Sequence, residues 1–162
     1  MAYNPSWPKW VQASVADHFK TVATTEGFSS LVDGLEERTT AFQDDPQRLE
    51  IRINGPFIRE RSKDDYIFNV TVNILIFSHM DGTTSSVYAG TNIAGKMAQA
   101  ASDSIPVYKY GAQAEDDASL IGCLTLTSGS GGVNVFHFGE VNAEDRLRQL
   151  GVDANFNMNI SL

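Results

Sequence analysis

The hydrophobic positions near the start of the chain predict one amphipathic helix. From Trp7 onward, apolar side chains recur every three or four residues, which places them on a single stripe of an α-helix. Ser6 can cap this helix, and Pro8 suits its first turn because the missing N–H costs nothing there. Gly27 can end it. We therefore expect a helix between Ser6 and Gly27, with Trp7 and Trp10 in the core.

Alternation of apolar and polar residues predicts most of the remaining chain as strands. We expect strands over residues 48–54, 57–61, 66–78, 106–110, 120–127, 133–138 and 152–162. The segment after Pro56 is expected at a sheet edge, where no ladder donor is needed. Leu75 and Phe77 make both faces of their strand apolar, which predicts a cover on both sides there. A strand that ends on Leu162 is expected to be tied to the core.

A second helix and several turns complete the pattern. Small residues recur with Ile93 and Met97 over residues 87–102, which predicts a helix close to a sheet. Residues 111–119 read as an acidic loop, and the glycine-rich run 128–132 reads as the tip of a hairpin between its two flanking strands. The order of elements predicts an α+β fold, a mostly antiparallel sheet with two helices packed on one face, as a single domain over residues 1–162.

Composition narrows the class of protein. The chain has 162 residues, of which 42% are hydrophobic, enough for one folded domain and too many for disorder. Its one cysteine, Cys123, excludes an internal disulfide framework and a multi-thiolate zinc site, and we expect it to be packed within its strand. No apolar run approaches the roughly 20 residues that cross a bilayer. The start lacks the features of a secretory signal, so we expect a soluble protein of a reducing compartment.

Charge is abundant but unevenly placed. Twelve basic and twenty acidic residues give a formal charge of −8, which disfavours binding to a phosphate backbone. Five of the bases lie close together in sequence: Arg48, Arg52, Arg59, Arg61 and Lys63. The segment 103–145 is strongly acidic. These two segments are either solvated surface or complementary patches that orient copies of the protein during assembly.

The sequence contains no recognisable catalytic, cofactor or metal motif. The histidines His18, His79 and His137 have no metal-ligand spacing, and we expect His18 on the helix surface or at the edge of the core. There is no nucleophile elbow, and the glycine-rich run 128–132 lacks the lysine and the following helix of a phosphate loop. Aromatic residues beside the arginine segment resemble a nucleic-acid surface only superficially. We predict that the protein is not an enzyme, with no cofactor and no metal.

Three segments together resemble a known group of proteins. The first is the tryptophan helix with residues 50–56 (EIRINGP), and the second is the strand 65–75 (DYIFNVTVNIL). The third is the ending, residues 133–139 (VNVFHFG) followed by 146–156 (RLRQLGVDANF). These resemble virion proteins of tailed bacteriophages, most closely the tail terminator, also called the tail-completion or tail-to-head joining protein.

The resemblance implies a non-enzymatic structural protein of the virion tail or neck, made in the host cytoplasm. It would form a homo-oligomeric ring, expected to be a hexamer, that ends the tail tube and joins it to the head connector. Its partners would be itself, the tail-tube protein and the connector or stopper protein. The genome would pass the lumen without sequence-specific binding, and no membrane would be involved.

Interface residues are predicted from the charged segments. They are Arg48, Arg52, Arg59, Arg61, Glu115, Asp116, Asp117, Glu140, Arg146 and Arg148. We expect the arginines of one copy to meet acids of the next, with the loop 111–119 and the run 128–132 as docking elements. The alternatives are a head-completion or stopper protein, a tail-tube subunit or, from another class, a small-ligand-binding or enzymatic α+β domain.

Overall fold

The computed structural model describes residues 4–109, 119–127, 132–142 and 146–161. Along the chain it contains α1 (Trp7–Thr25), β1 (Ser29–Val32), α2 (Thr40–Asp44), β2 (Arg48–Ser62), β3 (Asp65–His79), α3 (Thr84–Ser102), β4 (Ile105–Lys109), β5 (Ser119–Leu126), β6 (Val133–Asn142) and β7 (Leu147–Ser161). The predicted α+β class is confirmed. No described helix is long and apolar enough to span a membrane.

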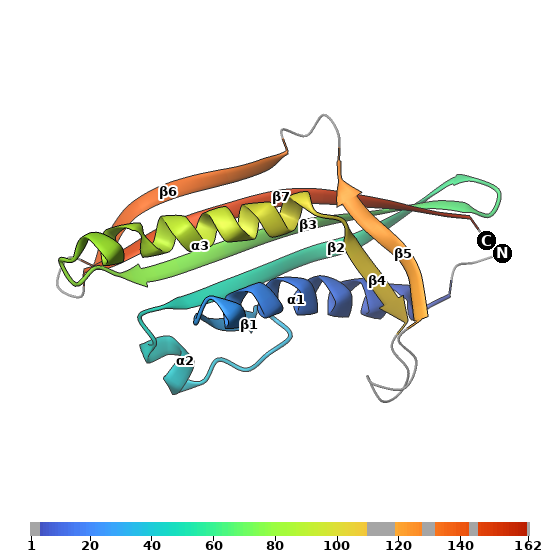
Figure 1. Cartoon of the computed structure of the whole chain (residues 1–162). Helices are drawn as coiled ribbons and strands as arrows, with labels where there is room; N and C mark the ends of the chain where they lie inside the picture. Colours follow the sequence, from blue (N-terminus) through green and yellow to red (C-terminus); the bar gives the residue numbers. More distant parts are fainter. Residues whose placement is uncertain (1–3, 110–118, 128–131, 143–145, 162) are drawn as a thin grey trace.

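The strands form a sheet in the order β1-β2-β3-β7-β5-β4, with β6 also paired to β7. Only the short β1 runs parallel to its neighbour; the other pairings are antiparallel. The long strands β2, β3 and β7 form the centre, and α1 and α3 lie along one face of them (Figure 1). This confirms the predicted mostly antiparallel sheet with two helices on one face.

The core lies between these helices and the sheet. Alternate residues of the two central strands are buried there: Phe68, Val70, Val72, Ile74 and Ile76 of β3, and Leu150, Val152, Ala154, Phe156 and Met158 of β7. Trp7 and Trp10 of α1 are each 6% exposed, and their rings meet edge to face with centroids 5.8 Å apart. Full burial of each large apolar side chain contributes about 1.5–3 kcal/mol. The tryptophans therefore belong to the core, as expected.

The two long helices begin differently from the prediction. Ser6 precedes α1, but its side chain makes no capping hydrogen bond. Asn4 accepts a hydrogen bond from the Ser6 N–H at 2.9 Å instead. The predicted capping role of Ser6 is therefore wrong. In α3 the side chain of Thr83 accepts from the Ser86 N–H at 3.2 Å, which lets the helix begin at Thr84, earlier than the expected residue 87.

β2 is one long strand with an irregularity at Asn54–Phe57. Gly55 has φ +105°, and a Cβ there would lie 2.7 Å from the backbone oxygen of Asn69, so the bend requires glycine. The Gln12 side chain donates to the Gly55 oxygen at 2.8 Å. Beyond Ile51, where its pairing with β1 ends, β2 has only β3 as a described partner. The predicted edge segment 57–61 is confirmed.

The predicted hairpin between the strands of residues 120–127 and 133–138 is wrong. β5 pairs with β4 and, through Thr125 and Leu126, with β7. β6 pairs along the same edge of β7, from Val133 opposite Ala154 to Asn142 opposite Leu147. A fifteen-residue strand offers enough edge for both neighbours in succession. The hairpin is therefore formed by β6 and β7.

Three smaller expectations can be compared with the structure. Leu75 and Phe77 are only half-buried, so the expected cover on both sides is incomplete; over the Phe77 ring it consists of the Arg48 guanidinium, 4.4 Å from the ring centroid. The expected packing of Cys123 is wrong: its side chain is exposed, since its neighbour Leu124 takes the inward position of β5. Leu162 and most of the expected loops 111–119 and 128–132 lie outside the described residues.

Candidate functional site: the open face and edges of the sheet

The face of the sheet turned away from α1 and α3 is called the open face below. It consists of the other set of alternate residues of β2, β3 and β7, and neither α1 nor α3 covers it. On β3 and β7 its side chains are half-buried or exposed, whereas those on the helix side are buried. A sheet face of this kind is available for contact with another molecule.

Amide and hydroxyl side chains form rows across the middle of the open face. Asn73 accepts from Asn54 at 3.1 Å and donates to Asp153 at 2.7 Å. Thr71 donates to Asn155 at 2.7 Å in the next row. Because these groups bond to one another across three strands, they fix side-chain positions on a solvated surface.

A charge cluster of Asp33, Arg38, Glu50 and Arg52 lies at one end of the open face. Arg38 binds both carboxylate oxygens of Glu50, with Nη1–Oε1 and Nη2–Oε2 distances of 2.6 and 2.9 Å. It also donates to Asp33 at 2.9 Å. Hydrogen bonding from Arg38 holds the pKa of Asp33 below its ordinary value, and the two carboxylates raise the pKa of Arg38. Arg52 completes the cluster at 3.2 Å from Asp33.

The predicted interface arginines of β2 do not form one patch. Arg48 covers Phe77 and donates to the Asp45 carbonyl at 2.9 Å, and Arg52 belongs to the charge cluster. Arg59 and Arg61 are exposed near the opposite end of the strand. At about 3.3 Å per residue, Arg48 and Arg59 are more than about 30 Å apart. Arg59 and Arg61 make no hydrogen bond or ion pair within the described part of the chain, although the charge of Arg61 helps to lower the pKa of Asp65.

The remaining predicted interface residues have varied surroundings. Arg148 is half-buried and donates to the Val87 carbonyl of α3 at 3.2 Å. The Arg146 carbonyl accepts from the Met80 N–H at 2.9 Å, and its side chain is exposed. Glu140 is exposed on β6, in register with Arg148. The acids Glu115, Asp116 and Asp117 lie outside the described residues, so their expected pairing stays a prediction.

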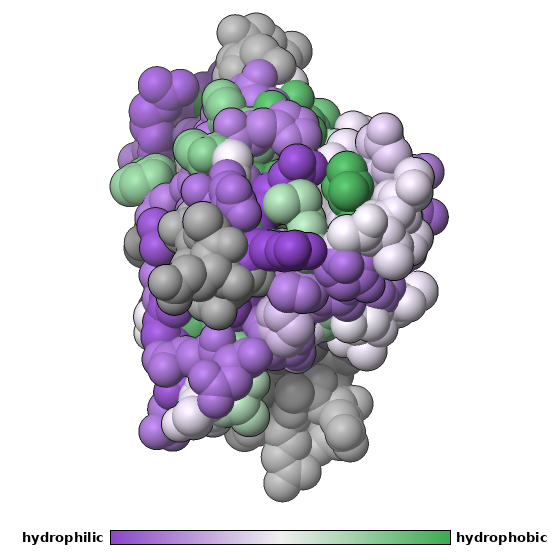
Figure 2. All heavy atoms as spheres, turned by 90° about the vertical axis from the view of Figure 1, so that its left-hand side faces the viewer, coloured by the Kyte–Doolittle hydropathy of each residue, from purple (hydrophilic) through white to green (hydrophobic). Residues whose placement is uncertain are grey.

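Exposed aromatic side chains lie on the open face, and the sequence patterns did not predict their exposure. Phe57 of β2 is 63% exposed, and Phe136 and Phe138 of β6 are 42% and 58% exposed. The last two rings have centroids 6.3 Å apart. A Cβ at Gly151 would lie 2.8 Å from Phe138 Cε2, so the lack of a side chain at Gly151 leaves room for the Phe138 ring against the sheet. By contrast, the end of the molecule where α3 begins is mostly hydrophilic (Figure 2).

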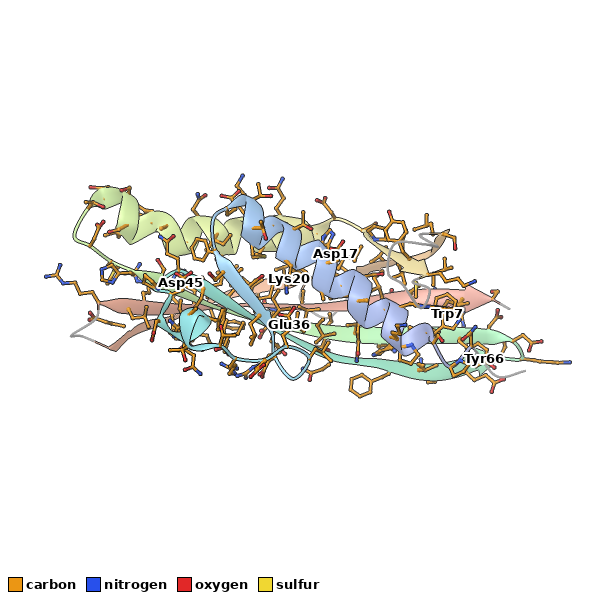
Figure 3. The ribbon with its side chains drawn as sticks, turned by 90° about the horizontal axis from the view of Figure 1, so that it is seen from below. Trp7, Asp17, Lys20, Glu36, Asp45 and Tyr66 are labelled. Atoms are coloured by element: carbon orange, nitrogen blue, oxygen red, sulfur yellow. The ribbon has the colours of Figure 1, made fainter. Side chains whose placement is uncertain are left out.

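A shallow depression of about 550 Å³ lies along α3, lined by Ser85, Tyr88, Thr91, Asn92, Lys96 and Gln99 among others. Among the described residues, no group of three or more His, Cys, Asp or Glu side chains is placed to hold a metal. His18 bonds the Ala100 carbonyl at 2.8 Å at the edge of the core, as expected. Charged pairs such as Lys20 with Glu36 link α1 to the segment after β1 (Figure 3).

Comparison with known proteins supports the fold and leaves function open. No protein-family model and no curated protein matches the chain. A solved protein structure is similar to it with a TM-score of 0.54 at 8% sequence identity, and 95% of each chain is covered. At that identity the likeness concerns the fold alone, so the same α+β arrangement occurs in a protein of very different sequence.

Proposed function

We propose that this protein is a non-enzymatic structural subunit of a tailed-phage virion, a tail terminator. Copies of it would form a ring, expected to be hexameric, on the end of the tail tube and join the tube to the head connector. The observation that carries the proposal is the open face, where exposed aromatic side chains lie on a rigid sheet. The sequence resemblance described above supplies the virion context.

The open face suits a subunit that is completed by neighbours. Exposed aromatic rings on a sheet are costly in a free monomer but supply contact area at low entropic cost in an interface. Exposed charges of opposite sign lie on different strands: Arg59 and Arg61 are on β2, and Glu140 is on β6. A ring joins different surfaces of adjacent copies, so such an arrangement fits cyclic assembly.

Charge reversal tests the proposal. The double substitution Arg59→Glu and Arg61→Glu should abolish ring formation without unfolding the monomer, because both side chains are exposed. A control with the same change in net charge is Lys9→Glu with Lys96→Glu, at two exposed positions on the helices. Multi-angle light scattering of the protein alone and co-sedimentation with tail tubes of the encoding phage would measure assembly. An unaffected ring in the arginine variant would overturn the pairing.

A further inference from the structure

Residues 34–46 connect β1 to β2, include α2, and are called the flap below (Figure 1). Of these thirteen residues only Phe42 is buried and Asp45 is half-buried, whereas the others are exposed. α2 contacts β1, and Leu31 of β1 is buried. Leu31 and Phe42 both lie outside the core between the helices and the sheet. The flap therefore rests on the sheet through a small apolar contact of its own.

Polar bonds supply the rest of the attachment of the flap. Arg38 binds Glu50 of β2 within the charge cluster, and Glu36 pairs with Lys20 of α1 (Figure 3). Ion pairs between partly exposed side chains contribute little to stability. A segment with one buried side chain and a few such bonds separates from the fold at a much lower free-energy cost than unfolding of the core.

The flap covers one end of a row of side chains that crosses the open face. By register, Leu31 lies opposite Glu50, Glu50 opposite Leu75, Leu75 opposite Gly151, and Gly151 opposite Phe136. Exposure rises along this row, from 3% at Leu31 and 7% at Glu50 to 42% at Phe136, with Leu75 half-buried between them. The row is therefore covered at the flap and open at β6.

Glu50 is compatible with a cover that comes and goes. Glutamate is almost never fully buried unless its charge is paired. With the flap closed, Arg38 supplies the two hydrogen bonds that the carboxylate needs. With the flap open, water supplies them instead, so the charge is solvated in both forms. An apolar residue at this position would favour the closed form alone.

We propose that the flap is a conformational switch of the open face, which opens as one unit while the rest of the fold stays intact. Opening uncovers Leu31 and Glu50, so the row that is exposed at Phe136 becomes accessible as far as β1. The open face then has two forms, one with its β1 end covered and one with its full width accessible. This behaviour is independent of the proposed virion function.

Thiol labelling measures the uncovering directly. In a Cys123→Ser background, Leu31→Cys places a thiol under the flap, and Val72→Cys, at a position 1% exposed in the main core, is the control. With excess dithionitrobenzoate under native conditions, we expect the thiol at residue 31 to react at least about a hundredfold faster. Its rate should hardly change at low urea concentrations, because a local opening exposes little surface. Equal rates with equal urea dependence would overturn the proposed opening.

Hydrogen exchange of the unaltered chain gives a second measurement. The amides of Glu36 and Gln43 donate to the Val32 and Thr39 carbonyls at 3.0 and 3.1 Å. Opening of the flap as a unit should give both amides the same protection, insensitive to low urea and at least about a hundredfold below that of β3 and β7. Exchange of these two amides only through global unfolding would contradict the switch.

A variant of the flap tests what holds it closed. Phe42→Ser removes its one buried side chain and should raise the labelling rate of the Leu31→Cys chain at least about tenfold. Leu35→Ser, at a side chain of the flap that is 60% exposed, is the matched control and should leave that rate unchanged. The same rate in both variants would show that Phe42 does not hold the flap, contrary to the proposal.

Discussion

Glu50 shows how single residues fix the border of the open face. Its side chain is only 7% exposed although it lies on the solvated side of β2. Arg38 supplies two hydrogen bonds and an opposite charge, which make the burial tolerable. The alternation of apolar and polar residues places Glu50 on the solvent-facing side of its strand. No feature of the neighbouring sequence indicates a partner twelve residues away.

Removing that partner should destabilise the fold. We expect Arg38→Ala to lower the free energy of unfolding by about 1–3 kcal/mol, because it leaves a buried carboxylate without its hydrogen bonds. Arg52→Ala is the matched control, since Arg52 is 3.8 Å from Glu50 and its side chain is 48% exposed. The control should change stability by no more than about 0.5 kcal/mol. Urea denaturation of both variants measures this; equal effects would contradict the assigned role of Arg38.

The hydrogen bonds of Asp81 predict how the stability of the protein changes at low pH. Hydrogen bonds from the hydroxyl and N–H of Thr83, at 2.6 and 2.8 Å, lower the pKa of Asp81 to about 2. A lowered folded-state pKa stabilises the protein above the ordinary value of 3.8, and the contribution is lost as pH falls toward about 2. An NMR titration should find this carboxyl titrating near 2, and Asp81→Asn should lessen the loss of stability between pH 4 and 2. Titration of Asp81 at its ordinary value would contradict the bonding described.

At the scale of elements, periodicity located the helices and long strands but not their partners. The stripe beginning at Trp7 and the small residues of α3 define helices because each faces the sheet with one side. The glycine-rich run suggested a local hairpin, whereas β5 and β6 each pair with β7. Which strands pair with β7 depends on residues that are distant in the sequence, so the local pattern does not reveal it. β1 and α2 are short and had no periodic signal. The exposed phenylalanines of β6 alternate as core residues do, so sequence alone could not identify them as surface.

Two glycines of α3 test how closely this helix packs on the sheet. A Cβ at Gly90 would lie 2.8 Å from Leu150 Cδ1 and 3.1 Å from Ser78 Cβ, whereas Gly95 has nothing within 4 Å. We expect Gly90→Ala to destabilise by about 1–3 kcal/mol through overpacking. Gly95→Ala should stabilise by about 0.4–1 kcal/mol, because alanine favours the helix. Thermal unfolding of the two variants checks the contrast, and stabilisation by both would contradict the close approach.

At the scale of the whole molecule, the helices and the sheet separate two kinds of surface. One face of the sheet is sealed by α1 and α3, and the other presents amide rows, a charge cluster and aromatic rings. The strands β2 and β6 continue this open face to opposite edges. A molecule with a sealed side and two unlike edges is suited to cyclic assembly, which is the basis of the proposed terminator ring.

Negative-stain electron microscopy of the protein mixed with tail tubes of the phage proposed to encode it tests that claim most directly. We expect ring-shaped density capping one end of each tube, and the Arg59→Glu, Arg61→Glu variant should leave the tubes bare. Long tubes formed by the protein itself would identify a tube subunit instead. Tubes that remain uncapped by the unaltered protein would contradict the terminator function.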